Sequence, residues 1–216
     1  MNGKPRILRP TAEPANRALL VGDPGRALLL ATELLTTPAP MFNHHRGLWG
    51  YSGPAADGSG MLMVQGTGIG GPSLNAVVSD LSLLGVERMV RIGTAASPCL
   101  ELEALVIAAE AGSDLGELSF KADSKLEESA TALFQGAARG AVVSASVHLT
   151  PTAEAIPEPA VAADLSTASL YEAAERLGFA ALSLLLITET GAGITSDGDL
   201  EAALKAIAPK ALALLS

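Results

Sequence analysis

Short apolar runs alternate with longer segments of helical period along most of the chain. The apolar runs predict six strands: Arg17–Val21, Gly60–Gln65, Arg88–Gly93, Ala104–Ala109, Ala141–His148 and Ala180–Thr188. The longer segments predict five helices: Arg26–Leu35, Pro72–Leu84, Ser124–Arg139, Ser166–Leu177 and Asp199–Leu215, the last interrupted by Pro209. Apolar strands that alternate with helices are typical of a parallel sheet covered on both faces. We therefore expect an α/β fold with a central mixed, mostly parallel sheet flanked by helices.

The length of the chain bounds its organisation. Its 216 residues can bury a sizeable hydrophobic core without disulfides or metal ions. No internal repeat or low-complexity linker divides the sequence, so residues 1–216 are expected to form a single domain. The proline-containing segment Thr150–Pro159 is the best candidate for a long surface loop.

Charge and apolar content narrow the classes of partner. A formal net charge of −9 disfavours binding to DNA, RNA or anionic lipid. No uninterrupted apolar stretch reaches the roughly 18–20 residues of a membrane span, and no signal-peptide core follows Met1–Pro10. The single cysteine, Cys99, has no partner for an internal disulfide. We expect a cytoplasmic protein that binds neither nucleic acid nor a membrane.

A turn rich in glycine joins the first predicted strand to the first predicted helix, with the sequence Val21-Gly22-Asp23-Pro24-Gly25-Arg26. Glycine lets the backbone approach an anion closely, the start of a helix offers unpaired N–H donors, and Arg26 adds a charged donor. Gly-Asp-Pro-Gly alone is also a common tight turn. The segment predicts an anion site only in combination with others.

Arg91 lies inside an otherwise apolar predicted strand that ends at Gly93 and is followed by Thr94. A buried guanidinium is costly unless it is paired, so Arg91 either pairs with a carboxylate or contacts an anionic ligand. Ligands of open α/β sheets bind at the carboxyl ends of the strands, where Thr94 lies. The strand by itself leaves both possibilities open.

Gly66, Gly68 and Gly71 match the dinucleotide-binding pattern G-x-G-x-x-G. Such a site also needs an acidic residue at the end of the next strand to hold the ribose hydroxyls. Here that strand ends in Arg91-Ile-Gly-Thr, and Glu87 lies at its beginning. No Lys-Ser or Lys-Thr follows the glycines, which excludes a Walker-type phosphate loop. We therefore consider a dinucleotide-dependent dehydrogenase a weak hypothesis for this chain.

The three histidines do not indicate a metal site. His44 and His45 are adjacent in the sequence, and adjacent side chains of a strand point to opposite faces. His148 is isolated in the sequence. No metal ligand set is predicted.

Four segments together resemble the nucleoside phosphorylase family, which includes uridine phosphorylase and the bacterial hexameric purine nucleoside phosphorylase. They are the Gly-Asp-Pro-x-Arg-like turn at Gly22, the segment Asn43–Gly47, the sequence Thr67-Gly-Ile-Gly-Gly-Pro-Ser73, and Arg91-Ile-Gly-Thr94. The amino-acid sequences of the last two segments, Thr67–Ser73 and Arg91–Thr94, are most similar to those of uridine phosphorylase. Their order and spacing over roughly the first 110 residues make the resemblance specific, and it implies a nucleoside phosphorylase-like fold.

The resemblance implies a phosphate site made by Gly22, Arg26, Arg91 and Thr94. It also implies that Arg46 enters the phosphate site of a neighbouring subunit, so that the active unit is a homodimer or a higher homo-oligomer. Arginines suit this chemistry, because phosphate must be held while oxocarbenium-like charge develops on the ribose. The related nucleosidases generally lack this arginine set, which favours phosphorolysis over hydrolysis.

The ribose site implied by the resemblance comprises Arg6, Thr94, Leu165 and Ser166. Asp164-Leu165-Ser166 falls where the family has Glu-Met-Glu, so an uncharged serine replaces the glutamate that holds the ribose hydroxyls. Ser166 is also an ordinary helix N-cap residue, and we favour that interpretation over a ribose contact. Arg6 falls where the family places a histidine that reaches the ribose of the partner, and it is also readable as part of a solvated terminus.

The base site departs further from the family. Glu189 follows the last predicted strand, close to the position of the aspartate that protonates the leaving base in purine-specific relatives. With Arg91 it forms the predicted catalytic pair, and Glu189 would act as the general acid. The Gln-x-Arg segment that binds uracil in the family has no counterpart, and Ala153-Glu154-Ala155 occupies the nearest positions.

The leading hypothesis is an enzyme that cleaves a nucleoside with inorganic phosphate to a free base and (deoxy)ribose 1-phosphate, with uridine slightly ahead of purine nucleosides. It needs no cofactor besides phosphate as co-substrate. The alternative is a catalytically impaired homologue of the same fold that binds phosphate or nucleoside, because Ser166, Glu189 and the missing Gln-x-Arg depart from the family.

Overall fold

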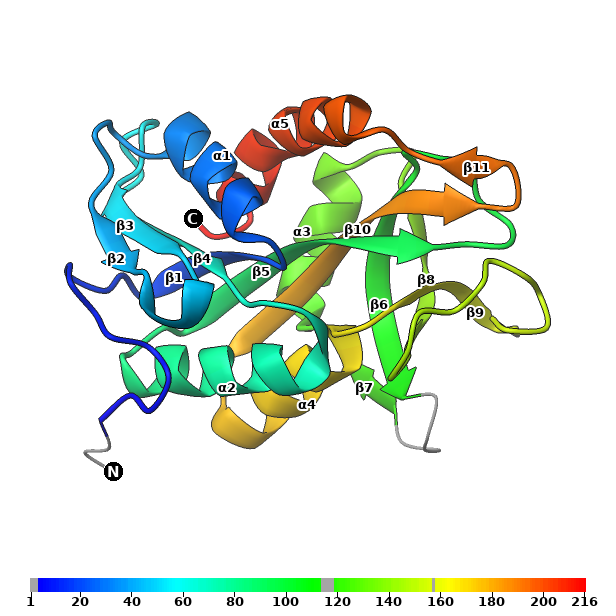
Figure 1. Cartoon of the computed structure of the whole chain (residues 1–216), viewed down its shortest axis with the longest axis horizontal. Helices are drawn as coiled ribbons and strands as arrows, with labels where there is room; N and C mark the ends of the chain where they lie inside the picture. Colours follow the sequence, from blue (N-terminus) through cyan, green and yellow to red (C-terminus); the bar gives the residue numbers. More distant parts are fainter. Residues whose placement is uncertain (1–3, 114–118, 157) are drawn as a thin grey trace.

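The computed structural model describes residues 4–113, 119–156 and 158–216, and their helices pack around one large sheet (Figure 1). The helices are α1 (Pro24–Leu34), α2 (Gly70–Leu83), α3 (Ser124–Leu133), α4 (Thr167–Leu177), α5 (Asp197–Ala213) and the short 3-10 helix η1 (His45–Gly47). The strands are β1 (Arg17–Val21), β2 (Met41–Asn43), β3 (Gly50–Pro54), β4 (Met61–Gly66), β5 (Arg88–Ala96), β6 (Leu105–Ser113), β7 (Ser119–Lys121), β8 (Ala138–Ser144), β9 (Ala160–Asp164), β10 (Ala180–Thr190) and β11 (Gly193–Ile194). The α/β fold with a mixed sheet is confirmed.

The strand order is β11-β10-β6-β8-β9-β5-β1-β4-β3-β2, and β7 pairs with β6. Because β10 also pairs with β5, the strands β5, β10, β6, β8 and β9 close into a barrel. The central strands β4, β1, β5 and β10 run parallel, whereas β2, β3 and β11 pair antiparallel with their neighbours. The carboxyl ends of the four parallel strands therefore lie at one edge.

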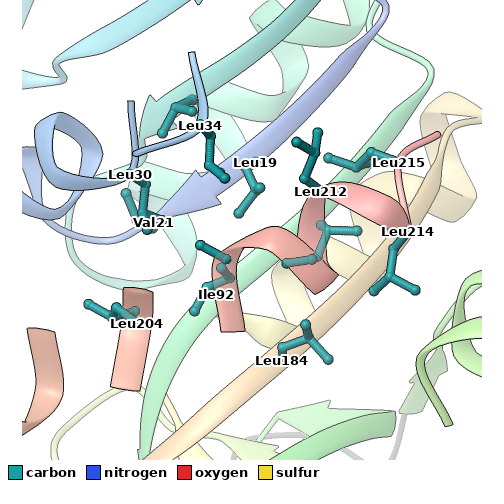
Figure 2. Packing of buried hydrophobic residues seen from close by; sticks show 14 of the residues in the cluster. Leu19, Val21, Leu30, Leu34, Ile92, Leu184, Leu204, Leu212, Leu214 and Leu215 are labelled. Carbon is teal, nitrogen blue, oxygen red and sulfur yellow. The ribbon is translucent and has the colours of Figure 1, made fainter. Parts of the chain in front are cut away.

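The buried faces of the sheet carry two hydrophobic layers. In β1, Leu19 and Val21 face the layer of α1, α3 and α5, whereas Ala18 and Leu20 face the layer of α2 and α4. Successive side chains of a strand point to opposite faces, so a strand covered on both faces is apolar throughout. Figure 2 shows the first layer, in which leucines of α1 and α5 surround Leu184 and the β1 side chains.

The predicted helix Ser124–Arg139 and strand Ala141–His148 are wrong at their boundaries. Helix α3 ends at Leu133, and Gly136 has φ +91°, a left-handed conformation that favours glycine. The chain then turns directly into β8, which includes Arg139 and ends at Ser144. Residues 134–139, which the prediction assigned to the helix, therefore form a turn and the start of β8.

Helix α5 is continuous, so the predicted interruption at Pro209 is wrong. Proline cannot donate the N–H that would bond to the carbonyl of Lys205 one turn earlier. Both residues are exposed, which lets water replace the missing donor. The opposite face, with Leu204 and Ala208, is buried and holds the helix in place.

Neither this 17-residue helix nor any other described helix is long and apolar enough to cross a bilayer.

Five short strands have no counterpart in the sequence prediction: β2, β3, β7, β9 and β11. Their two to five residues are too few for a clear alternation of apolar and polar positions, and they form because neighbouring strands pair with them. The predicted loop Thr150–Pro159 consists of turns that lead into β9, with Pro157 outside the described residues. Met1–Gly3 also lie outside them.

We expect Leu184→Ala to lower the free energy of unfolding by about 2–5 kcal/mol, because it leaves a cavity in the layer between β10 and α5. Leu28→Ala is the control, since Leu28 is 45% exposed on α1 whereas Leu184 is fully buried. Urea denaturation of both variants measures the difference. Equal losses would contradict the assignment of this layer as the core.

Candidate functional site

A cavity of about 640 Å³ lies where β1, β4 and β5 end and α4 begins. This size is typical of a pocket for a small molecule. It is lined by Gly22, Asp23, Pro24, Arg26, Arg46, Gly47, Leu48, Gly68, Ile69, Gly70, Ser73, Arg91, Thr94, Leu165 and Ser166. All the predicted phosphate residues and three of the four predicted ribose residues are therefore at one place.

Three arginines from different elements line this cavity: Arg26 on α1, Arg46 on η1 and Arg91 on β5. Arg46 is exposed, Arg26 is half-buried and Arg91 is 6% exposed. Within the described residues, neither Arg26 nor Arg46 pairs with a carboxylate. Their charge is therefore available to an anion in the cavity, although the chain as a whole is acidic.

Arg91 is paired with a carboxylate, which is one of the two possibilities that its strand left open. Its Nη1 donates to Oδ2 of Asp164 at 2.8 Å and to Oγ1 of Thr167 at 3.3 Å. The same side chain lines the cavity, and its Nε has no acceptor among the described residues. Because the carboxylate of Asp164 is fully buried, it neutralises Arg91 from the protein side. One edge of the guanidinium is thereby fixed toward α4.

Gly93 provides the space for this arrangement. A Cβ at position 93 would lie 2.5 Å from Cζ of Arg91, closer than any real contact. The guanidinium therefore folds back across its own strand, over the residue two positions further on. This close approach explains why glycine follows Arg91-Ile in the sequence.

Asp164 organises the start of α4. Its carboxylate accepts hydrogen bonds from the hydroxyls of Ser144 and Thr167, at 2.6 and 2.8 Å, and from the backbone N–H groups of Ser166 and Thr167 at 3.1 Å. Asp164 thus satisfies the free N–H groups that a helix start leaves unpaired. This side chain lies at the end of β9, where the sequence prediction had no strand.

Ser166 occupies the N-cap position of α4, but its side chain makes no capping hydrogen bond. The interpretation of Ser166 as an ordinary N-cap is therefore wrong in its chemistry, because Asp164 has taken the available donors. The Ser166 side chain lines the cavity instead. A hydroxyl with no hydrogen-bond partner among the described residues can bind a polar ligand from the cavity wall.

The two helix starts at the cavity differ. At α1, the carboxylate of Asp23 accepts the N–H of Arg26 at 2.9 Å, so the expected free donor at this position is already paired. At α2, the N-cap residue Ile69 provides no side-chain cap, and Gly68 and Gly70 have φ +74° and +79°. The glycine-rich turn therefore presents the uncapped start of α2 to the cavity, where the helix dipole favours an anion.

A smaller cavity of about 110 Å³ adjoins the first, and Thr94 and Leu165 line both. Glu189 lies in its wall, directly after a β-bulge in β10 between Ile187 and Glu189. Bulges re-aim side chains and are common beside active sites. Oε2 of Glu189 lies 2.9 Å from Nε2 of His148, a contact that the sequence analysis did not predict.

The relatives found by sequence comparison are enzymes of one kind. The chain is 31% identical over 211 residues to the purine nucleoside phosphorylase DeoD-type of Geobacillus kaustophilus, and 87% of each protein is covered. For the proteins of the same name from Clostridium perfringens and Caldanaerobacter subterraneus, the identities are 32% over 195 residues and 29% over 199, with 81–83% of each chain covered. No family model matches the sequence. The chain belongs to the nucleoside phosphorylase family.

Family membership confirms the resemblance, the fold and the enzyme class, a pentosyltransferase of the nucleoside phosphorylase type. All three relatives are named for purine nucleosides, so they lend no support to the expected preference for uridine. The roles of the individual side chains stay predictions. Their positions relative to the cavity are what the structure adds.

Arg6 is the one predicted ribose residue that lies away from the cavity of its own chain. It is exposed, and its backbone N–H donates to Asp80 of α2 at 2.8 Å. The same carboxylate binds the N–H groups of Ile7 and Leu8, so this buried aspartate fastens the N-terminal segment to the α2 layer. A role of Arg6 or Arg46 in a neighbouring subunit stays a prediction.

Tyr171 lies behind the ion pair and is not an acid or a base of the site. Its hydroxyl donates to the carbonyl of Ala108 at 2.5 Å and accepts the N–H of Ser183 at 2.9 Å. Burial raises the pKa of Tyr171, and nearby Asp164 raises it further, so the phenol stays neutral at physiological pH. The side chain therefore joins α4 to β6 and β10.

A second large cavity, of about 540 Å³ between α1 and α5, is less suited to an anion. Its lining includes the four carboxylates Asp23, Glu33, Asp197 and Glu201, against Arg26 and Lys205. The cavity with three arginines is therefore the candidate active site.

Among the residues that the structure describes, no group of three His, Cys, Asp or Glu side chains could hold a metal ion.

We expect Asp164→Asn to lower the free energy of unfolding by about 3–5 kcal/mol, because it leaves the buried guanidinium of Arg91 without its countercharge. Ser166→Ala is the neighbouring control, and it should cost less than about 1 kcal/mol because no side-chain hydrogen bond is lost. Urea denaturation compares the two variants. A loss in Asp164→Asn no greater than that in Ser166→Ala would show that the ion pair does not hold this region together.

Proposed function

We propose that this enzyme cleaves purine nucleosides with inorganic phosphate, giving the free base and ribose 1-phosphate. The curated relatives with the same name support purine over pyrimidine. The absence of a Gln-x-Arg segment between Thr150 and Pro159 agrees with that choice. The observation that carries the proposal is the meeting of three arginines at one cavity beside a half-buried glutamate.

Phosphate binding is proposed at the arginine end of the large cavity. Arg26 and Arg46 have no carboxylate partner among the described residues, and Arg91 is held toward the cavity by Asp164. The uncapped start of α2 adds a partial positive charge. Fixed positive groups of this kind can hold phosphate as a nucleophile and need no rearrangement during the reaction.

Ribose binding is proposed in the middle, where Thr94 and Leu165 line both cavities and the Ser166 side chain meets the larger one. A sugar there would have phosphate on one side and its base on the other. Ser166 offers an uncharged hydrogen bond where the family has a carboxylate, and such bonds are weaker than charged ones. We therefore expect turnover slower than is usual for a nucleoside phosphorylase.

Base binding is proposed in the small cavity, with Glu189 as the proton donor. Phosphate attacks C1′ of the ribose while the bond from C1′ to the base nitrogen breaks, and the electron pair of that bond passes to the base. A carboxylic acid within reach of a ring nitrogen neutralises the charge that accumulates there. The order of the two cavities matches the order of phosphate, ribose and base along this reaction.

The test of the function is a panel of inosine, guanosine, adenosine and uridine, each incubated with the protein in the presence and absence of phosphate. We expect release of free base from the purine nucleosides only when phosphate is present. Equal release without phosphate would indicate a nucleosidase, and faster release from uridine would overturn the choice of purine. Binding of phosphate or nucleoside by calorimetry without any release would identify a non-catalytic homologue.

We expect Arg26→Gln to raise the KM for phosphate by about 10- to 100-fold, because a charge-assisted hydrogen bond contributes about 1.5–3 kcal/mol. Arg176→Gln is the matched control. Arg176 is exposed on α4 and contacts Asn75 at 3.1 Å, away from the cavity. Steady-state kinetics with varied phosphate and a fixed purine nucleoside measure the change. An unchanged KM in Arg26→Gln would remove Arg26 from the phosphate site.

A further inference from the structure

We propose that His148 is a positioning residue for Glu189, which holds the carboxyl group at the base end of the cavity and renews its proton during turnover. This inference rests on the proposed function and extends it to a residue outside the phosphate and ribose sites. The juxtaposition that carries it is the contact between Nε2 of His148 and Oε2 of Glu189 at 2.9 Å.

The two side chains come from separate parts of the fold. Glu189 follows the bulge near the end of β10, and His148 lies in the irregular segment after β8. Both line the small cavity. Glu189 is 23% exposed and His148 is 68% exposed, so the glutamate faces the cavity while the histidine remains open to solvent. A group exposed in this way can exchange protons with water after each turnover.

The remaining titratable group in the lining of the small cavity is Asp164. Its carboxylate is fully buried and engaged by Arg91, Ser144 and Thr167. It is thus committed to the ion pair and to the start of α4. Of the described residues that line this cavity, His148 is the one that can carry a positive charge to Glu189. Because Oε2 of Glu189 contacts His148, we assign the other carboxyl oxygen to the contact with the base.

As the C1′–N bond breaks, its electron pair moves onto the purine, and the carboxyl proton of Glu189 passes to a ring nitrogen of the leaving base. The resulting carboxylate takes the proton of the His148 imidazolium, and solvent protonates the imidazole again. The phosphate loses its last proton to solvent as ribose 1-phosphate forms, so the proton given to the base is replaced. No oxidant, reductant or further reactant is needed.

The dependence on pH follows from histidine chemistry. A histidine side chain exchanges its proton between about pH 5 and 8. An imidazolium can resupply a carboxylate with a proton, and a neutral imidazole cannot. We therefore expect kcat with an unmodified purine nucleoside to fall as the pH rises through this range, and His148→Gln to abolish that dependence.

The experiment compares guanosine with 7-methylguanosine, whose base already carries a positive charge and leaves without taking up a proton at N7. His148→Gln keeps a side chain that can hydrogen-bond to Glu189 but cannot carry the proton. Val147→Ala, at a neighbouring residue that is 64% exposed, is the control for the segment. We measure kcat and KM for both nucleosides at saturating phosphate, with pH profiles from 5 to 8.

For guanosine, His148→Gln should lower kcat by about tenfold or more, as expected when general-acid catalysis worth about 10²–10⁴ is impaired. For 7-methylguanosine the kcat should stay within about twofold of the unsubstituted enzyme, as it should for both nucleosides in Val147→Ala. Equal loss with both nucleosides, or no loss with either, would overturn the role of His148 and leave the proposed function standing. Absence of phosphate-dependent turnover in the unsubstituted enzyme would overturn both.

Discussion

The buried ion pair between Arg91 and Asp164 joins the central sheet to the start of α4, and the geometry of the cavity depends on it. Arg91 belongs to β5, which pairs with both β1 and β10, whereas Asp164 ends β9, which pairs antiparallel with the end of β5. The carboxylate neutralises the guanidinium, accepts the hydroxyls of Ser144 and Thr167, and caps the helix. The further hydrogen bonds of the Asp164 carboxylate offset part of the cost of burying its charge.

The closure of the sheet determines where the chemistry can occur. Because β10 pairs with β5 on one side and with β6 on the other, the ends of β5, β9 and β10 converge beside the start of α4. Cationic side chains meet on the β1 and β4 side of this point, and the carboxyl group of Glu189 lies on the β10 side. In the proposed function, phosphate and base thereby have separate ends of one site, with Thr94 and Leu165 between them.

Two features keep the charges of the site apart. Asp164 is committed to Arg91 and to the backbone of α4, so it does not compete with a bound phosphate for Arg26 or Arg46. Glu189 is beyond Thr94, in a cavity that the arginines do not line, and its described ionic partner is His148. The three arginines and the carboxyl group of Glu189 therefore line different cavities, which agrees with an anion bound at one end and a proton donor at the other.

The sequence by itself determined the α/β class, the core strands β1, β4, β5 and β10, and the motifs that place Gly22, Arg26, Arg91 and Thr94 at strand ends. These features are local, since apolar periodicity and glycine-rich turns act over a few residues. The tertiary structure decided the barrel closure, the short strands, the partner of Arg91 and the contact between His148 and Glu189. Each of these depends on residues far apart in the chain, and a single sequence contains no signal for which distant side chains will meet.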